Sequence, residues 1–307
     1  SITLTKYIGT SRDVVIPGKL DGKQVKIASF QNLETDKGSG SLTVGSSTQK
    51  AIYEGTSLEK AFYNTKYISV DLSGLDISNV TTMKGMFKPW SNSNLQSINV
   101  KNLDTSKVTD MSEMFYGCEN LSSLDLRTWN TSNVTTMADM FSDCEKLKTL
   151  NLPKISNVTD THSMFWKCSG LTSLDLSKLD TSNVTNMYGM FGFCQFKTLD
   201  LSSLNTANVT NMRHMFYGCS GSEAVDVSKL DTSNVTNMSE MFRDCRGIKQ
   251  LDVSKFDTSN VTNMKALFYS CSKLEQLDLS NFNTSKVQDM SFMFHDCDIC
   301  GIYVWIL

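Results

Sequence analysis

The chain has 307 residues and a formal net charge of −3, with 20% charged and 40% hydrophobic residues. This near-neutral composition, which lacks any dense block of Lys and Arg, argues against nucleic acid as a partner. No segment approaches the roughly 18 to 20 continuous apolar residues of a membrane-spanning helix, so we expect no membrane insertion.

The first 57 residues lie outside the repeat that fills the rest of the chain. Short β-like runs alternate here with turn signals at Pro17-Gly18 and Asp21-Gly22. Such segments are suited to covering the open end of a stack of coils. We therefore predict an N-terminal capping region over residues 1–57.

A long repeat begins after this region. The pattern L-x-x-L-D-L-S-x-L-D-T-S-N-V-T-N-M-x-x-M-F-x-x-C occurs nine times between Val80 and Val287, with a period of 24 to 28 residues. This period, with leucines spaced as LxxLxL, is typical of a solenoid whose coils bury their apolar faces against each other. We predict about nine to ten coils over residues 58–307, truncated at the C-terminus.

Each coil contains two predicted elements. Leu124 and Leu126 alternate with polar residues, which indicates a strand with one buried face, and stacked coils would join such strands into a parallel sheet. The apolar spacing i, i+3, i+4, i+7 in MxxMFxxC predicts a short helix. The fold class is therefore an α/β repeat: a right-handed leucine-rich-repeat solenoid with a parallel sheet on one face and short helices on another.

Sulfur-containing residues are confined to regular columns. All sixteen methionines occupy two columns, and eight of the nine cysteines, from Cys118 to Cys297, occupy a third. We assign the methionines to the core and favour free buried thiols over disulfides between neighbouring coils. Cys297-x-x-Cys300 could indicate zinc or redox chemistry, but Cys297 belongs to the column, which favours a structural role.

No enzyme motif is present. His162, His214 and His295 fall at different repeat positions, so we expect incidental surface residues rather than a catalytic or metal site. Catalytic serine, zinc-protease and nucleotide-binding signatures are also missing. We predict that the chain is not an enzyme and needs no cofactor.

The segment LDTSNVTNMSEMFRDC at 230–245 and its near copies resemble the repeat of the BspA-like leucine-rich-repeat surface proteins of bacteria, over about residues 58–304. The opening RDVVIPGKLDGKQVKIASF is similar to a second repeat type of that family. The resemblance implies a secreted protein on the bacterial cell surface that binds host matrix or mucus proteins, glycans or other cells. We also expect the chain to be monomeric. The resemblance does not identify any ligand-binding residue in this chain.

A row of acidic residues is the first candidate binding surface. It lies between the two strand leucines of successive coils and includes Asp125, Asp175, Asp200, Asp226, Asp252 and Asp278. Carboxylates one strand spacing apart repel each other, so they need compensating bonds or cations. We favour bonds to nearby Ser hydroxyls or backbone amides; the alternatives are a basic ligand or calcium along Asp175, Asp200 and Asp226.

Aromatic residues form the second candidate surface. Tyr116, Trp166, Tyr217 and Tyr269 each follow the core phenylalanine of a coil. They could bind sugars or a partner protein, or could only pack along the edge of the coils. Two other functions stay open: a passive spacer that presents another domain and, less favoured, ice binding through the threonine column from Thr81 to Thr262.

Overall fold

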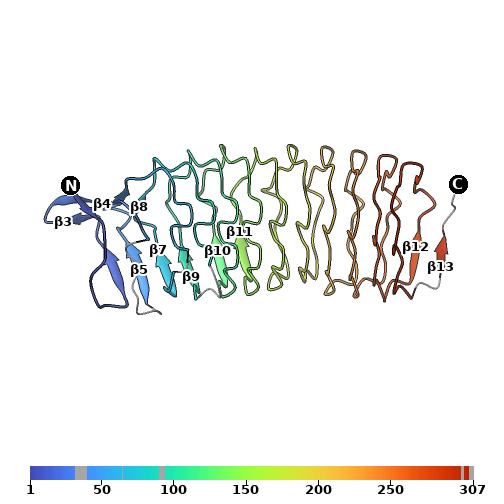
Figure 1. The fold of residues 1–307 in the computed structure, drawn as a ribbon, viewed down its shortest axis with the longest axis horizontal. Coiled ribbons are helices and arrows are strands. Elements are labelled where there is room, and N and C mark those ends of the chain that lie inside the picture. The colour runs from blue at the N-terminus through green and yellow to red at the C-terminus, as the bar shows by residue number, and fades with distance from the viewer. Residues whose placement is uncertain (32–39, 64, 90–93, 299–300, 304–307) are drawn as a thin grey trace. The chain divides into compact units, whose positions relative to one another are not determined.

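The computed structural model describes residues 1–31, 40–63, 65–89, 94–298 and 301–303 (Figure 1). The chain forms two compact units, Ser1–Asn157 and Val158–Leu307, which are considered separately below as unit 1 and unit 2. The boundary lies in the coil that is two residues shorter than the usual repeat.

Unit 1 contains short strands that pair in parallel across successive coils. One sheet has the order β1-β4-β6-β8, with β3 added antiparallel to β4; a second has the order β2-β5-β7-β9, and β10 pairs with β11. The strands are β1 (Ile2–Leu4), β2 (Val14–Ile16), β3 (Lys19–Leu20), β4 (Lys23–Ile27), β5 (Ser41–Val44), β6 (Ala51–Tyr53), β7 (Ser69–Asp71), β8 (Leu75–Asp76), β9 (Ser97–Asn99), β10 (Ser123–Asp125) and β11 (Thr149–Asn151).

The register of these strands places equivalent apolar residues on top of each other. Leu42 pairs with Val70, and Val70 with Ile98; Leu124 pairs with Leu150. All five side chains are buried. The alternation of apolar and polar residues in the sequence therefore identified the strand and its buried face, and the parallel stacking is confirmed.

Unit 2 continues the same coil pattern with fewer regular strands. Its strands β12 (Gln276–Asp278) and β13 (Gly301–Tyr303) pair in parallel. Single parallel bridges join further coils, as between Ala224 and Gln250 and between Gln250 and Gln276. Unit 2 is thus also a parallel β-solenoid.

The predicted short helices are wrong: the described residues form no helix, and so no helix that could cross a membrane. In MxxMFxxC, amides bond instead to the carbonyl three residues earlier, as Met114 does to Met111 and Cys118 to Phe115. Alternate amides point to the next coil, as Met111 N–H does to the Thr136 carbonyl and Phe115 N–H to that of Met140. The segment is a ladder of turns shared between coils.

Left-handed backbone conformations explain why this ladder is not a helix. In each such segment, the residue two before the core phenylalanine and usually the residue two after it have positive φ, as in Glu113 (57°) and Gly117 (71°). An α-helix cannot contain such residues. The spacing i, i+3, i+4, i+7 still brings the apolar side chains to one side, because successive turns of about four residues have nearly the helical period.

The apolar side chains of these turns form the core. Phenylalanine rings stack from coil to coil, with centroids 5.5 Å apart for Phe87 and Phe115 in unit 1 and 5.8 Å apart for Phe165 and Phe191 in unit 2. The methionines are buried as predicted, except that Met290, in the last MxxMFxxC segment, is 46% exposed. Within each unit, this ring contact makes neighbouring coils the main source of each coil's stability.

Cysteine, threonine and asparagine form hydrogen-bonded ladders. The eight column cysteines are free thiols, and seven of them have Sγ 2.7–3.6 Å from the phenylalanine carbonyl of the preceding coil. Thr236 Oγ1 donates to the Thr210 carbonyl, 3.2 Å away, and Asn234 Nδ2 to that of Ala207, 2.7 Å away. Cys300 lies outside the described residues.

Candidate functional site

Each MxxMFxxC segment has four positions without a fixed residue type, which we call the variable positions. They lie between the two methionines and between phenylalanine and cysteine. In unit 2 they change from Tyr188-Gly189 to Arg213-His214 to Ser239-Glu240 in successive coils. Because the turns carry them along one edge of the stacked coils, this edge has the most diverse surface chemistry of the solenoid.

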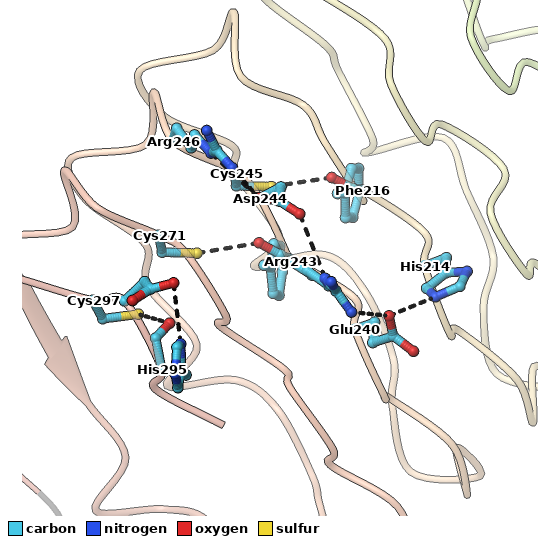
Figure 2. A network of polar contacts seen from close by, with 12 residues as sticks. His214, Phe216, Glu240, Arg243, Asp244, Cys245, Arg246, Cys271, His295 and Cys297 are labelled. Carbon is cyan, nitrogen blue, oxygen red and sulfur yellow. Dashed lines mark hydrogen bonds and ion pairs between the residues drawn. The ribbon is translucent and has the colours of Figure 1, made fainter. Parts of the chain in front are cut away.

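Glu240 is the centre of an ionic network at this edge (Figure 2). Its carboxylate oxygens lie 2.9 Å from Arg213 Nη2, 2.9 Å from Arg243 Nη1 and 3.2 Å from His214 Nε2. The side chains of Glu240 and His214 are each only 12% exposed. The network thus joins two successive coils through half-buried charges.

The contacts of His214 favour one tautomer. Nε2 faces the Glu240 carboxylate, which only accepts hydrogen bonds, while Nδ1 lies 3.0 Å from the Tyr188 hydroxyl. The nearby carboxylate favours the neutral tautomer with its proton on Nε2, although this nitrogen makes no aligned hydrogen bond; Nδ1 then accepts the Tyr188 hydroxyl proton. The expectation of an incidental surface histidine is wrong, because residues of adjacent coils enclose it on both sides.

The network shifts the acid–base equilibria of both residues. Burial lowers the pKa of His214, assisted by Arg213 and Arg243 and opposed by Glu240. Burial alone would raise the pKa of Glu240, but His214, Arg213 and Arg243 together lower it. Glu240 is consequently a carboxylate that holds its cations, whereas His214 is preferentially neutral.

Three of the four predicted aromatic residues adjoin this network. The ring of Trp166 stacks on Tyr217 with centroids 6.0 Å apart, and Phe193 packs edge to face on both, at 5.1 and 4.9 Å. The Arg243 guanidinium lies 4.5 Å from the ring centre of Tyr269 and 5.6 Å from that of Tyr217. We call Trp166, Tyr188, Phe193, Arg213, His214, Tyr217, Glu240, Arg243 and Tyr269 the aromatic–charged cluster.

Tyr116, the fourth predicted aromatic residue, belongs to unit 1. The Lys88 ammonium lies 4.3 Å from its ring centre and also pairs with Glu113. Burial, together with Asp143, Asp139 and Glu113, raises the pKa of Tyr116 to about 12. It has a cationic neighbour as Tyr269 does, but none of the aromatic neighbours of Trp166.

The acidic row lies on the strand side of the coils. Asp200 and Asp226 each accept a hydrogen bond from the backbone amide two residues later, at 2.8 and 2.9 Å. Equivalent bonds of 2.9 Å fix Asp175, Asp252 and Asp278. These bonds, with those from the serine side chains, lower the pKa of all five carboxyls.

Asp125 differs from the rest of the row. Arg127 donates to its two oxygens from Nε and Nη2 at 2.9 and 2.8 Å, and this pair lowers the pKa of Asp125 to about 2. Within the described ranges, no group of three or more His, Cys, Asp or Glu side chains is arranged to hold a metal ion. Bonds from Ser residues and from Arg127 compensate these carboxylates, and calcium along Asp175, Asp200 and Asp226 stays an untested alternative.

The sequence pointed to the aromatic residues but missed Arg213, His214, Glu240 and Arg243. Their charges come together because the turn ladder places the variable positions of adjacent coils side by side. One available signal was that all four fall at variable positions of consecutive repeats, with Glu240 27 residues after Arg213 and 26 after His214.

A protein-family comparison identifies the repeated part of the chain. A family described as "Mycoplasma protein of unknown function, DUF285" matches residues 56–173, 148–224 and 220–300. The chain belongs to the DUF285 family. The DUF285 matches cover most of the chain and leave out the first 55 residues. No curated protein matches the chain significantly.

Several solved structures are similar to this DUF285 chain. A leucine-rich repeat protein from Eubacterium ventriosum shares 16% identity, with 92% of this chain and 85% of that chain covered and a TM-score of 0.47. One from Bacteroides ovatus shares 16%, with 98% and 88% covered and a TM-score of 0.45. A leucine rich cell surface protein from Faecalibacterium prausnitzii shares 16%, with 98% and 89% covered and a TM-score of 0.37.

Proposed function

We propose that the chain is a bacterial cell-surface adhesin that binds host matrix or mucus proteins, glycans or other cells through the aromatic–charged cluster. The cluster is the observation that carries this proposal. It concentrates Trp, Tyr and Arg, the residue types that contribute most to binding energy at protein interfaces, in the variable part of an otherwise uniform repeat.

The rigidity of the cluster supports a binding role. Trp166, Tyr217 and Arg243 hold each other by stacking and cation–π contacts, so little side-chain entropy is lost when a partner binds. All three are half-buried and keep part of their surface accessible. A pre-ordered surface with both apolar and charged groups is suited to a folded partner.

The resemblance to BspA-like proteins supports the bacterial part of the proposal. Secretion, display on the cell surface, a monomeric state and the lack of enzymatic activity belong to the same proposal. The uniform strands and turns build a scaffold, and the variable positions give it a recognition surface.

Binding to immobilised extracellular-matrix proteins and mucin tests this function. We expect binding by the whole chain and at least a tenfold loss of affinity in Trp166→Ala and Tyr217→Ala, as for central interface residues. Gln250→Ala, an exposed position on the strand side, serves as the matched control and should bind normally. Thermal denaturation establishes that all variants are folded.

The passive spacer is the other outcome of the same experiment. A spacer would bind none of the immobilised molecules, and its aromatic variants would behave as the parent chain does. That result would reject the adhesin function and leave edge packing as the role of the aromatic column.

A further inference from the structure

A depression of about 360 Å³ adjoins the aromatic–charged cluster in unit 2. It is lined by Phe193, Gln195, Gly218, Ser220, Asp244 and Arg246. These residues come from three successive coils, at and just after the variable positions that follow the core phenylalanine. The depression is therefore a product of stacking, and no single repeat contains it.

Phe193 supplies the apolar wall of this depression. Its φ is 57°, at a position where other coils carry Gly117, Gly218 or Asp244. A phenylalanine pays a conformational cost in this region, which glycine does not. Its ring is held by edge-to-face contacts with Trp166 and Tyr217, so the apolar wall is fixed in place.

Gly218 keeps the ring of Phe193 accessible. A Cβ atom at this glycine would lie 2.6 Å from Cδ1 of Phe193, and the φ of Gly218 is 69°. Any side chain here would collide with the ring or displace it. The glycine thus preserves both the left-handed turn and the opening beside the aromatic wall.

The remaining lining is a compact set of hydrogen-bonding groups. Arg246 holds Asp244 through Nη2 and Nε, at 2.8 and 3.2 Å from Oδ1. Ser220 Oγ lies 3.4 Å from Gln195 Oε1. The depression consequently offers a carboxylate, a guanidinium, an amide and a hydroxyl, with the acid and the base already paired to each other.

We propose that this depression binds one uncharged pyranose residue of a glycan, either a hexose or an N-acetylhexosamine. A pyranose has an apolar C–H surface that packs on an aromatic ring, and hydroxyls that both donate to Asp244 and Gln195 and accept from Arg246 and Ser220. The paired charges give no net attraction for an ionic ligand. This inference deepens the proposed adhesin function, on which it rests, by naming a ligand class.

Titration of the whole chain with methyl glycosides of glucose, galactose and mannose, and with N-acetylglucosamine and N-acetylgalactosamine, tests the inference. Saturation-transfer NMR and calorimetry should detect at least one of these with a dissociation constant of about 1 mM, as expected for a ligand of this size in an open site. N-acetylneuraminic acid is the charged comparator and should bind more weakly.

Two variants locate the site. Gln195→Ala removes a polar group, and Phe193→Gly removes the ring while accepting the positive φ without strain, so this variant should fold. Each should weaken sugar binding at least fivefold, whereas Gln250→Ala should not. Sugar binding unchanged in both variants, or preference for the charged sugar, would overturn the inference.

The outcomes separate this inference from the adhesin function. If the chain binds matrix proteins but none of the five sugars, the pyranose site is wrong and the adhesin function stands. If it binds neither sugars nor immobilised proteins and mucin, both are wrong.

Discussion

The indole ring of Trp166 lies over Gly192 of the next coil. A Cβ atom on Gly192 would be 2.3 Å from both Cε3 and Cζ3 of this indole. The missing side chain lets Trp166 reach Tyr217, which is two coils away in the sequence. The aromatic surface of unit 2 therefore depends on a glycine that contributes no contact of its own.

Gly192→Ala should lower the free energy of unfolding by about 1 to 3 kcal/mol, because the new methyl group overpacks against Trp166. Denaturant unfolding measures this change. In a Trp166→Ala background, the same substitution should cost much less, since the clashing ring is gone. An equal loss in both backgrounds would contradict the proposed steric relationship.

Thr232→Val should also be destabilising. Thr232 Oγ1 is buried, donates to the Asp257 carbonyl at 2.9 Å and accepts from the Asp257 amide at 2.8 Å. Valine keeps the shape but leaves both backbone groups unpaired, at a cost of about 1 to 3 kcal/mol. Thr236→Val, at an exposed ladder position, should change stability by less than about 0.5 kcal/mol. A similar effect of both substitutions would argue against the role of the buried hydroxyl.

The stability of the chain should fall as the pH is lowered from 7.5 to 5.5. The pKa of His214 in the fold is below its ordinary value of 6.5, so the unfolded chain binds more protons in this interval. The contribution of neutral His214 to the free energy of unfolding is complete above about pH 6.5. It is lost as the pH falls below 6.5 towards the lower pKa of His214 in the fold. Protonation at Nδ1 also reverses the hydrogen bond with Tyr188, whose hydroxyl must then accept instead of donate.

His214→Gln should show a smaller loss of stability over the same interval. Chemical denaturation at several pH values tests this, and measurements stay above pH 5 because carboxyl groups titrate below it. His162 and His295 are present in both proteins, so the difference isolates His214. Identical pH profiles of the two proteins would refute this assignment.

The thiols of the cysteine column should differ sharply in reactivity. Burial raises the pKa of Cys144, Cys194 and Cys245 well above the ordinary value and that of Cys219 to about 12. A hydrogen bond with Cys271 lowers the pKa of Cys297, which is also less buried. Iodoacetamide should therefore label Cys297 before the other column thiols.

Mass mapping of native Cys300→Ser protein follows this labelling without interference from Cys300. The intact mass should show no disulfides, and the buried thiols should react only after denaturation. Disulfides between column cysteines would show that these residues are not free thiols in solution.

The sequence predicted the stacking of coils, the buried columns and the parallel strands because each depends on residues that recur at one position. It did not predict the turn ladder, because the Met and Phe spacing is shared by helices and by successive turns. The residues that distinguish the turns from a helix are Gly117, Asp143, Gly218 and Asp244, since glycine and aspartate tolerate left-handed conformations.

The candidate site was less predictable than the fold. Trp166 and Tyr217 stood out as aromatic residues in one column, but their orientation depends on two exceptions to the repeat. Gly192 stands in the aromatic column, and Phe193 stands where Gly218 and Asp244 lie in the following coils. The charges around Glu240 come from two coils, and single-repeat patterns do not reveal such a pairing. The structure was needed to show that the aromatic and charged residues form one cluster, which the acidic row does not join.

The sharing of alternate amides between coils also affects how such a protein can evolve. Within each unit, the described coils present similar donors to one neighbour and similar acceptors to the other, so a duplicated 26-residue segment could join the same amide ladder. Duplication or loss of a coil would then change the length of the protein while preserving the scaffold. A copy inserted outside the coils of the aromatic–charged cluster would supply new variable positions and leave contacts such as that of Trp166 with Tyr217 intact.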